Sequence, residues 1–171
     1  IEQLRNTRHG DDVANHLRIA RYDMISITKQ ICDLFVDWIA MNNVEFHINT
    51  QTSVLWVWID RRKMEFALRV LLSNALKNTY RFGKISINIS VVRSNGKAYC
   101  SFSIQDDGLG ESESTRLGLK QIVDMTESSG AIFEGISSED ETGTQYTILI
   151  PLGRSHYMER AVEFIEPDGD L

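Results

Sequence analysis

The sequence predicts one α/β domain of the α+β kind: a two-layer sandwich in which three helices cover one face of a mixed, mostly antiparallel sheet of about five or six strands. Segments with apolar residues at helical spacing follow segments in which every second residue is apolar. The predicted strands are apolar on one face only, which is typical of a sheet covered from one side. A chain of 171 residues, 42% of them hydrophobic, suffices for one compact core but not for two domains.

The composition argues against several classes of partner. A formal net charge of -6 opposes general attraction to nucleic acid, so no direct nucleic-acid partner is expected. The basic run 61–63 is interpreted as solvated surface at the start of a helix. Cys32 and Cys100 lie in apolar periodic segments without a CxxC spacing, which favours buried thiols over a disulfide.

The N-terminal third of the chain predicts a connector, a helix and a hairpin. Residues 1–15 are polar and weakly periodic. From Asp23, which suits an N-cap, an apolar stripe at helical spacing continues to Met41. Residues 44–48 and 54–59 then alternate around a polar turn, as the two strands of a hairpin do.

The remaining elements follow in a regular order. Asp60 suits the N-cap of a second helix that continues to Thr79, with Ile59 and Met64 spaced as a hydrophobic staple. Alternating residues on both sides of Asn95-Gly96 predict an antiparallel hairpin. A third helix is expected over about 115–127, ending at Gly130, and two strands are expected over 132–136 and 145–150.

The second helix carries the first residues that suit chemistry. Val70, Asn74, Lys77 and Asn78 lie along one edge of its apolar stripe. A carboxamide oxygen is a suitable ligand for Mg²⁺, and a lysine one turn further on can reach a phosphate. The alternative is that these are ordinary polar residues at the boundary of the core, since short motifs are weak on their own.

Three further features contain glycine. The run Asp106-Asp-Gly-Leu-Gly110 follows a buried strand, where a carboxylate can accept a hydrogen bond from an adenine amino group. Arg116-Leu-Gly-Leu119 begins the third helix, where free backbone N–H groups favour phosphate. Gly143-Thr144 precedes the last strand. Each feature alone is equally explained by a turn or by packing.

In this order the four motifs resemble those of the GHKL ATPase superfamily, and specifically the catalytic domain of sensor histidine kinases. Residues 71–79 are similar to the N box, 106–110 to the G1 box, 117–119 to the end of the G2 box, and 143–144 to the final glycine motif. The resemblance covers 21–152. It leaves 1–20 as the end of a dimerisation helix with its connector and 153–171 as a C-terminal linker. The flanking segments 57–60 and 150–156 are similar to kinases of the hybrid two-component type.

The resemblance implies the Bergerat fold and a domain that donates the γ-phosphoryl group of MgATP to a histidine. That histidine would lie on a separate dimerisation domain of the same protein, so no catalytic residue is expected in this chain. Asn74 would bind Mg²⁺, Lys77 would meet the phosphates, and Asp106 would bind the adenine amino group with support from Thr144. The remaining cofactor-binding residues would be Asn78, Gly108, Gly110, Arg116 and Gly118.

The resemblance also implies the setting of the domain. The parent would be a homodimer in the bacterial inner membrane, with this domain in the cytoplasm. Its partners would be the dimerisation and histidine phosphotransfer domain and a receiver domain or response regulator. The chain's own histidines lack the neighbours of the family's phosphorylated helix and are interpreted as structural or exposed: His9, His16, His47 and His156.

Several residues depart from the family's pattern. Val70 replaces the first asparagine of the N box, and only residues 111–116 separate the G1 box from Leu117-Gly-Leu119. No aromatic F box is present, and Ser114 and Arg116 occupy positions where glycines are expected. One interpretation is that MgATP still binds, aided by the charge of Arg116. The alternatives are a pseudokinase module retained for signalling and an unrelated α/β ligand-binding domain.

Overall fold

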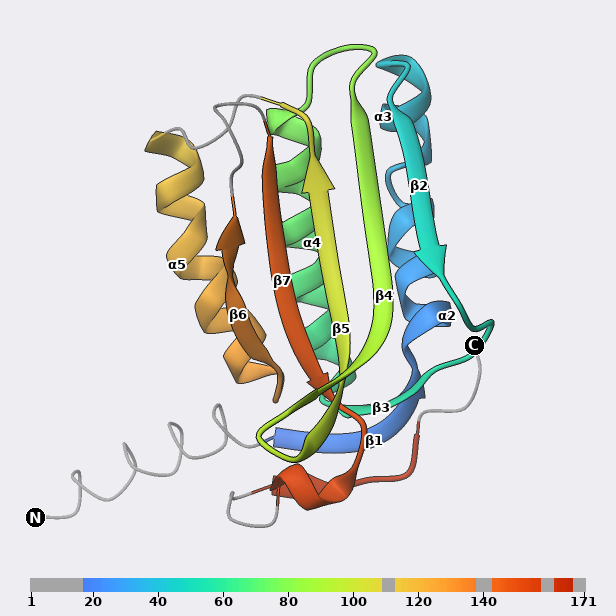
Figure 1. Ribbon diagram of the computed structural model, residues 1–171, viewed down its shortest axis with the longest axis vertical. Coiled ribbons are helices and arrows are strands. Elements are labelled where there is room, and N and C mark those ends of the chain that lie inside the picture. The colour runs from blue at the N-terminus through green and yellow to red at the C-terminus, as the bar shows by residue number, and fades with distance from the viewer. Residues whose placement is uncertain (1–16, 109–112, 138–142, 158–161, 168–171) are drawn as a thin grey trace, which may run out of the picture.

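The computed structural model describes residues 17–108, 113–137, 143–157 and 162–167. Figure 1 shows a large twisted sheet with the helices packed on one of its faces and a small sheet crossing beneath one end. The α+β sandwich that the sequence predicts is therefore confirmed, with its strands divided between two sheets. The predicted terminal helix and connector over 1–15 lie outside the described residues.

The larger sheet has five strands, which lie in the spatial order β2-β4-β5-β7-β6. Their bounds in that order are Glu45–Thr50, Lys84–Ser94, Lys97–Asp106, Thr144–Pro151 and Ile132–Ser137. The β4-β5 hairpin is confirmed, and Asn95 and Gly96 at its tip both have positive φ, as the short turn between twisted strands requires.

The smaller sheet has the order β3-β1-β8, formed by Trp56–Ile59, Leu17–Asp23 and Val162–Phe164. The sequence assigned 17–20 to a connector and 153–171 to a linker, but the structure differs at both ends. Leu17 and Ile19 are buried against Tyr157, which lies in the short 3₁₀ helix η1 (Arg154–Tyr157) and whose hydroxyl donates to the Trp58 carbonyl oxygen at 2.6 Å. A three-residue strand is too short to show a period in the sequence.

The helices are α2 (Met24–Asp33), α3 (Val36–Met41), α4 (Arg61–Asn78) and α5 (Glu113–Ser128). Both predicted N-caps are confirmed: an Asp23 oxygen accepts from the Ile25 N–H at 3.1 Å and an Asp60 oxygen from the Lys63 N–H at 3.4 Å.

The single helix expected over 23–41 is wrong, because the chain breaks at Leu34 and Phe35. The backbone of Phe35 leaves the helical region. Leu34 is 61% exposed, whereas Phe35 and Ile39 pack against the core. The break therefore changes the direction in which the apolar residues point, so that Phe35 and Ile39 face the core. In a straight helix the apolar stripe would turn away from the sheet.

The hairpin expected over 44–59 is also wrong. The first of its two segments, β2, pairs in parallel with β4, while the second, β3, pairs antiparallel with β1 in the other sheet. Parallel neighbours need a crossover, and α4 supplies it between β2 and β4. Alternation in the sequence shows which face of a strand is buried but not which strand is its neighbour.

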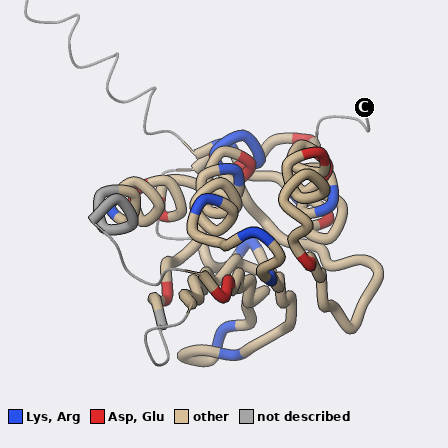
Figure 2. Tube along the Cα trace, turned by 90° about the horizontal axis from the view of Figure 1, so that it is seen from above, with Lys and Arg blue, Asp and Glu red and all other residues tan. Residues whose placement is uncertain are grey.

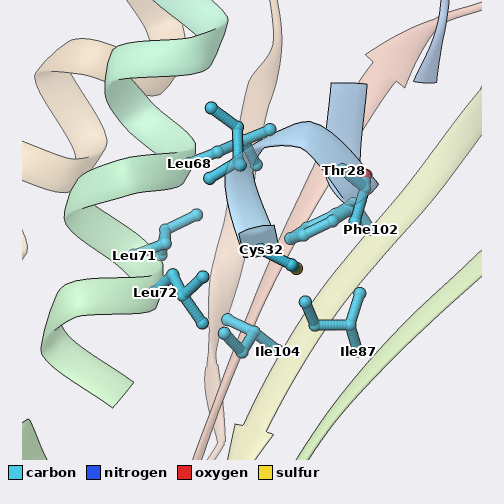
Figure 3. Close-up of a pocket in the computed structure, with 9 residues that line it drawn as sticks. Thr28, Cys32, Leu68, Leu71, Leu72, Ile87, Phe102 and Ile104 are labelled. Atoms are coloured by element: carbon cyan, nitrogen blue, oxygen red, sulfur yellow. The ribbon is translucent and has the colours of Figure 1, made fainter. Parts of the chain in front are cut away.

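The core lies between the helices and the larger sheet, and both cysteines belong to it as free thiols. Figure 3 shows a small cavity between α2, α4 and the sheet, where Cys32 faces Leu68, Leu72 and Phe102. Burial raises the pKa of the Cys32 thiol and of the Cys100 thiol to about 12. Both thiols are therefore protonated and unreactive at neutral pH, in agreement with the sequence.

No helix among the described residues combines the length and the apolar character needed to cross a lipid bilayer.

Gly130 joins α5 to β6 and tests how tightly η1 is seated. Its φ is +99°, and a Cβ there would lie 2.5 Å from the Tyr157 hydroxyl oxygen. Gly130→Ala should lower the free energy of unfolding by about 1 to 2 kcal/mol for the backbone strain and by roughly 1 to 3 kcal/mol more for overpacking. Urea denaturation measures the change. Gly96→Ala is the matched control, since its φ is +76° but nothing lies within 4 Å. Equal losses in the two variants would show that Tyr157 is loosely held.

Candidate functional site

The loop after β5 is clamped between α4 and β7. A Cβ on Gly108 would lie 1.7 Å from the carbonyl oxygen of Asn78, so no larger residue fits against the end of α4. The Gly143 N–H donates to the Gly108 carbonyl oxygen at 3.1 Å. A Cβ on Gly143 would lie 2.3 Å from the Asp106 carbonyl oxygen. The end of α4, the end of β5 and the start of β7 therefore meet at this point.

The two adjacent acids of the loop have different tasks. An Asp107 oxygen accepts from the Lys84 N–H at 2.9 Å, and the Asp107 N–H donates to the Lys84 carbonyl oxygen at 3.2 Å. This pair of bonds ties the loop to β4. Asp107 is exposed and acts as an anchor, whereas Asp106 is 2% exposed and points into the domain.

The Asp106 carboxyl group is only partly satisfied. Oδ1 accepts from the Gly108 N–H at 3.0 Å, but Oδ2 is buried and has no hydrogen-bond partner within the described part of the chain. Burial raises the pKa of this carboxyl group to about 6, against the opposing effect of the Gly108 N–H. The charge of Asp107 raises the pKa further and the Thr144 N–H lowers it. Near neutral pH the group is a desolvated acceptor.

A second unsatisfied atom lies beside it. Thr144 is paired in register with Asp106 across β5 and β7, is 1% exposed, and has a buried Oγ1 that no described residue bonds. A buried polar atom left unpaired costs about 1–3 kcal/mol, so such atoms call for a ligand or an ordered water. An adenine edge fits: its amino group donates to a carboxylate and its ring nitrogens accept from a hydroxyl.

The other part of the site lies one turn earlier on α4. Asn74 is half-buried, and its Nδ2 is buried with no partner among the residues described. A Cβ on Gly118 would lie 2.9 Å from that atom, so α5 rests directly on Asn74. Gly118 thus has a packing reason to be glycine.

Asn74 also lines an open groove along the outer side of α4. The other residues that line it are Phe35, Arg69, Val70, Ser73, Lys77 and Gln121. Figure 2 shows lysine and arginine positions repeated along the central helix, which is α4. Among the described residues the lining contains two cations and no acid, so the groove suits an anion.

The predicted site residues are therefore brought together in two groups. Asp106, Gly108, Asn78 and Thr144 surround the loop after β5. Asn74, Lys77 and Gly118 belong to the groove or its wall, and Asn78 lies one helical turn from Asn74. The groove lining does not include Asp106, which borders a separate depression where β4 begins and β5 ends, with Lys84, Ser86, Gln105 and Asp107.

Two predicted residues cannot be placed within either group. Gly110 lies outside the described residues, and Arg116 belongs to α5 but its side chain is not described. The sequence did not single out Arg69. Its spacing of four and eight residues from Ser73 and Lys77, along one stripe of a helix, is the signal that finds it.

Histidines and metal clusters add nothing to this site. His47 is exposed and bonds Glu45 at 2.7 Å, and the His156 ring meets the Tyr99 ring edge to face. Both are thus structural or exposed, as expected from the sequence, while His9 and His16 lie outside the described residues. The described residues contain no group of three or more histidine, cysteine or acidic side chains able to hold a metal ion. A divalent cation would therefore depend on the Asn74 carboxamide and on oxygens of its own ligand.

The fold defines the class of protein. The chain has the α+β fold of the catalytic domains of sensor histidine kinases. The described parts of the four motifs lie in the second half of α4, in the loop after β5, in α5 and at the start of β7. The resemblance seen in the sequence is thereby confirmed at the level of the fold.

Three solved structures illustrate the likeness. The nucleotide-free catalytic domain of histidine kinase ThkA superposes with a TM-score of 0.68 at 20% identity, over 79% of this chain and 97% of that one. ThkA in complex with the response regulator TrrA gives 0.69 at 18% identity, over 90% and 47%. Full-length ShkA in complex with AMPPNP gives 0.66 at 16% identity, over 89% and 41%.

In sequence, the chain is similar to histidine kinase P4 of Formosa agariphila. The two are 21% identical over an alignment 187 residues long, which covers 95% of this chain. The chain spans only 13% of the length of that relative. No protein-family model matches the chain.

The raised pKa of Asp106 predicts a dependence of stability on pH. The folded chain binds this proton more tightly than the unfolded chain, where the pKa is near 3.8. Ionisation therefore destabilises the fold above about pH 6, and the penalty disappears as the pH falls towards 4. Asp106→Asn should raise the free energy of unfolding at pH 7.5 and lose most of this advantage by pH 4.5, as measured by urea denaturation across the range.

Asp124→Asn, at an exposed position of α5, is the control and should retain the wild-type dependence on pH. If Asp106→Asn gave the same difference from wild type at pH 4.5 and 7.5, the carboxyl group would not be desolvated.

Proposed function

We propose that this chain is the ATP-binding domain of a sensor histidine kinase and that it presents the γ-phosphoryl group of MgATP to a histidine on a separate dimerisation domain. The observation that carries the proposal is a pair of buried polar atoms, Asp106 Oδ2 and Thr144 Oγ1, that have no partner among the described residues and lie beside a loop whose glycines pack tightly against α4 and β5. The fold and the similarity to histidine kinases support it.

At the adenine end, the chain's residues act by hydrogen bonding in a desolvated site. Asp106 accepts from the amino group of the base and Thr144 supports the same edge. Gly108 lets the loop lie directly against the end of α4 at Asn78, and Gly110 is the further residue that the resemblance implies for this side. A carboxylate that cannot be solvated discriminates strongly, because a base without a donor leaves it unpaired.

At the phosphate end, the chain positions and neutralises charge. Asn74 offers its carboxamide oxygen to Mg²⁺, and Lys77 meets the phosphates. The resemblance assigns Gly118 and Arg116 to the same end of the ligand. When bound, MgATP supplies the phosphoryl group and the metal that screens its charge. This domain orients that group, while the acceptor histidine belongs to the dimerisation domain.

The wider setting belongs to the same proposal. The parent is a dimeric kinase of the hybrid type in the bacterial inner membrane, with this domain facing the cytoplasm and a receiver domain or response regulator accepting the phosphoryl group. The complex of ThkA with TrrA supports a response-regulator partner for a protein of this fold.

Titration calorimetry tests the adenine end. The chain should bind ATP and ADP but not GTP, whose oxygen at the corresponding position repels a carboxylate. Asp106→Asn and Thr144→Val should weaken ATP binding by about 10- to 100-fold, because each removes a hydrogen bond from a desolvated site. Asp124→Asn should bind like wild type. Failure of the folded wild-type chain to bind ATP at millimolar concentration would refute the assignment.

A second candidate is a pseudokinase module. The short segment 111–116, between the G1 box and the end of the G2 box, favours it. The helix α5 begins at Glu113, only five residues after Gly108, and Val70 gives the groove an apolar residue. The loss of two backbone hydrogen bonds to phosphate would weaken affinity by roughly 100-fold. Such a module would keep the fold and the coupling to its partner domains without turnover.

Phosphorylation of the full-length parent separates the two candidates. With labelled ATP, a working donor domain should transfer acid-labile label to the parent's histidine, and Asn74→Ala should abolish the label while leaving the folded state intact by circular dichroism. A pseudokinase would show no label in wild type, yet its signalling output would survive Asn74→Ala. Label that persists in Asn74→Ala would exclude the proposed role of that residue.

A further inference from the structure

We propose that Arg69 is a phosphate-binding residue, so that two cations of α4, Arg69 and Lys77, hold the anionic part of the ligand. The inference rests on the proposed nucleotide-binding function and deepens it. It assigns a role to a residue that precedes the N-box-like segment 71–79 and that the family pattern does not include.

The geometry of α4 places the two cations on one side of the groove. Arg69, Ser73 and Lys77 follow each other at intervals of four residues, and all three line it. The rise along the helix from the first to the last is about 12 Å, at 1.5 Å per residue. Their side chains are long enough to converge above Ser73, and a chain of phosphates can bridge them.

The charge of Arg69 is not used elsewhere within the described part of the chain. Other arginines have partners: Arg61 bonds Glu65 at 2.8 Å, and Arg21 and Arg154 stack on tryptophan rings. Arg69 is exposed, has no ion pair among the described residues, and borders a groove without an acid. The Arg69 guanidinium and the Lys77 ammonium line the same groove, and neither has an ion pair among the described residues. An anion bound between them would stabilise this arrangement.

The residue next to Arg69 explains what the second cation replaces. Val70 is half-buried, packs against the core and also lines the groove, so it offers no polar atom to a metal or a phosphate. An arginine one position earlier restores binding by a different route, because its planar fork can hold two phosphate oxygens directly. Phosphate binding should therefore depend less on Mg²⁺ than it would in a domain with asparagine at both position 70 and position 74.

Titration calorimetry of the chain with adenosine, ATP and inorganic tripolyphosphate, each with Mg²⁺ and with a chelator, tests this inference. Arg69→Gln should weaken ATP binding by about 10- to 100-fold and leave adenosine binding unchanged, since hydrogen bonds to charged groups have that magnitude. The ATP affinity of Arg69→Lys should lie between those of wild type and Arg69→Gln. The matched control is Arg62→Gln, an exposed arginine of the same helix that does not line the groove, and it should bind like wild type.

Each outcome decides a separate point. Unchanged ATP affinity in Arg69→Gln, or an equal loss for ATP and adenosine, overturns the role of Arg69 while the nucleotide function stands. Tripolyphosphate binding that needs Arg69, without any adenosine or ATP binding, supports the role of Arg69 and refutes the adenine assignment. A folded wild-type chain that binds none of the three ligands overturns both.

Discussion

The close approach of Gly108 to the last turn of α4 is the constraint on which the candidate site depends. There is no room for a Cβ between the loop and the Asn78 carbonyl oxygen, so the end of β5 is drawn under the helix. Gly143 then closes the contact from the side of β7. As a result, the Asp106 carboxyl group is buried beside the Thr144 hydroxyl, although both lie at strand ends, where polar groups ordinarily reach water.

The two halves of the site rely on different physics. Around Asp106 the carboxyl group is already buried from solvent. In the proposed function, short-range hydrogen bonds to this group determine which edge of the ligand's base fits. Along the groove of α4, Arg69 and Lys77 remain exposed, so attraction there acts over a longer range and is screened by salt. In the proposed function, the first half gives selectivity and the second strengthens the binding of a charged ligand. Asn74 belongs to the groove, and it packs closely against α5 because Gly118 has no side chain.

Local chemistry allowed much of the fold to be predicted from the sequence. Asp23 and Asp60 cap the helices that follow them, and Asn95-Gly96 turns the β4-β5 hairpin. The sequence did not show which strands are neighbours in the sheets. The alternation in β2 and β3 shows a buried face, but their different neighbours are chosen by the crossover through α4. The strand β8 has three residues and gains its place only by pairing with β1.

The same limit applies to the candidate site. Asn74, Asp106 and Thr144 could be named because they sit in motifs with a fixed order. That their polar atoms are buried and have no partner in the described part of the chain follows only from the three-dimensional contact of α4, α5 and two strand ends. Arg69 was passed over because a single arginine on an exposed helical face looks like ordinary surface until the groove beside it is seen to lack acids.

The parallel pairing of β8 with β1 has a mechanical consequence. Leu17 lies opposite Val162, so the chain runs into both strands from the same end and leaves both at the other. A pull between the segment before β1 and the segment after β8 acts along the strands in opposite senses. It loads the hydrogen bonds of the ladder together, with the Ile165 N–H to Ile19 bond of 2.9 Å at its far end, instead of opening them one by one. The small sheet therefore resists such a pull in shear, with Leu17 and Phe164 at opposite ends of the ladder between β1 and β8.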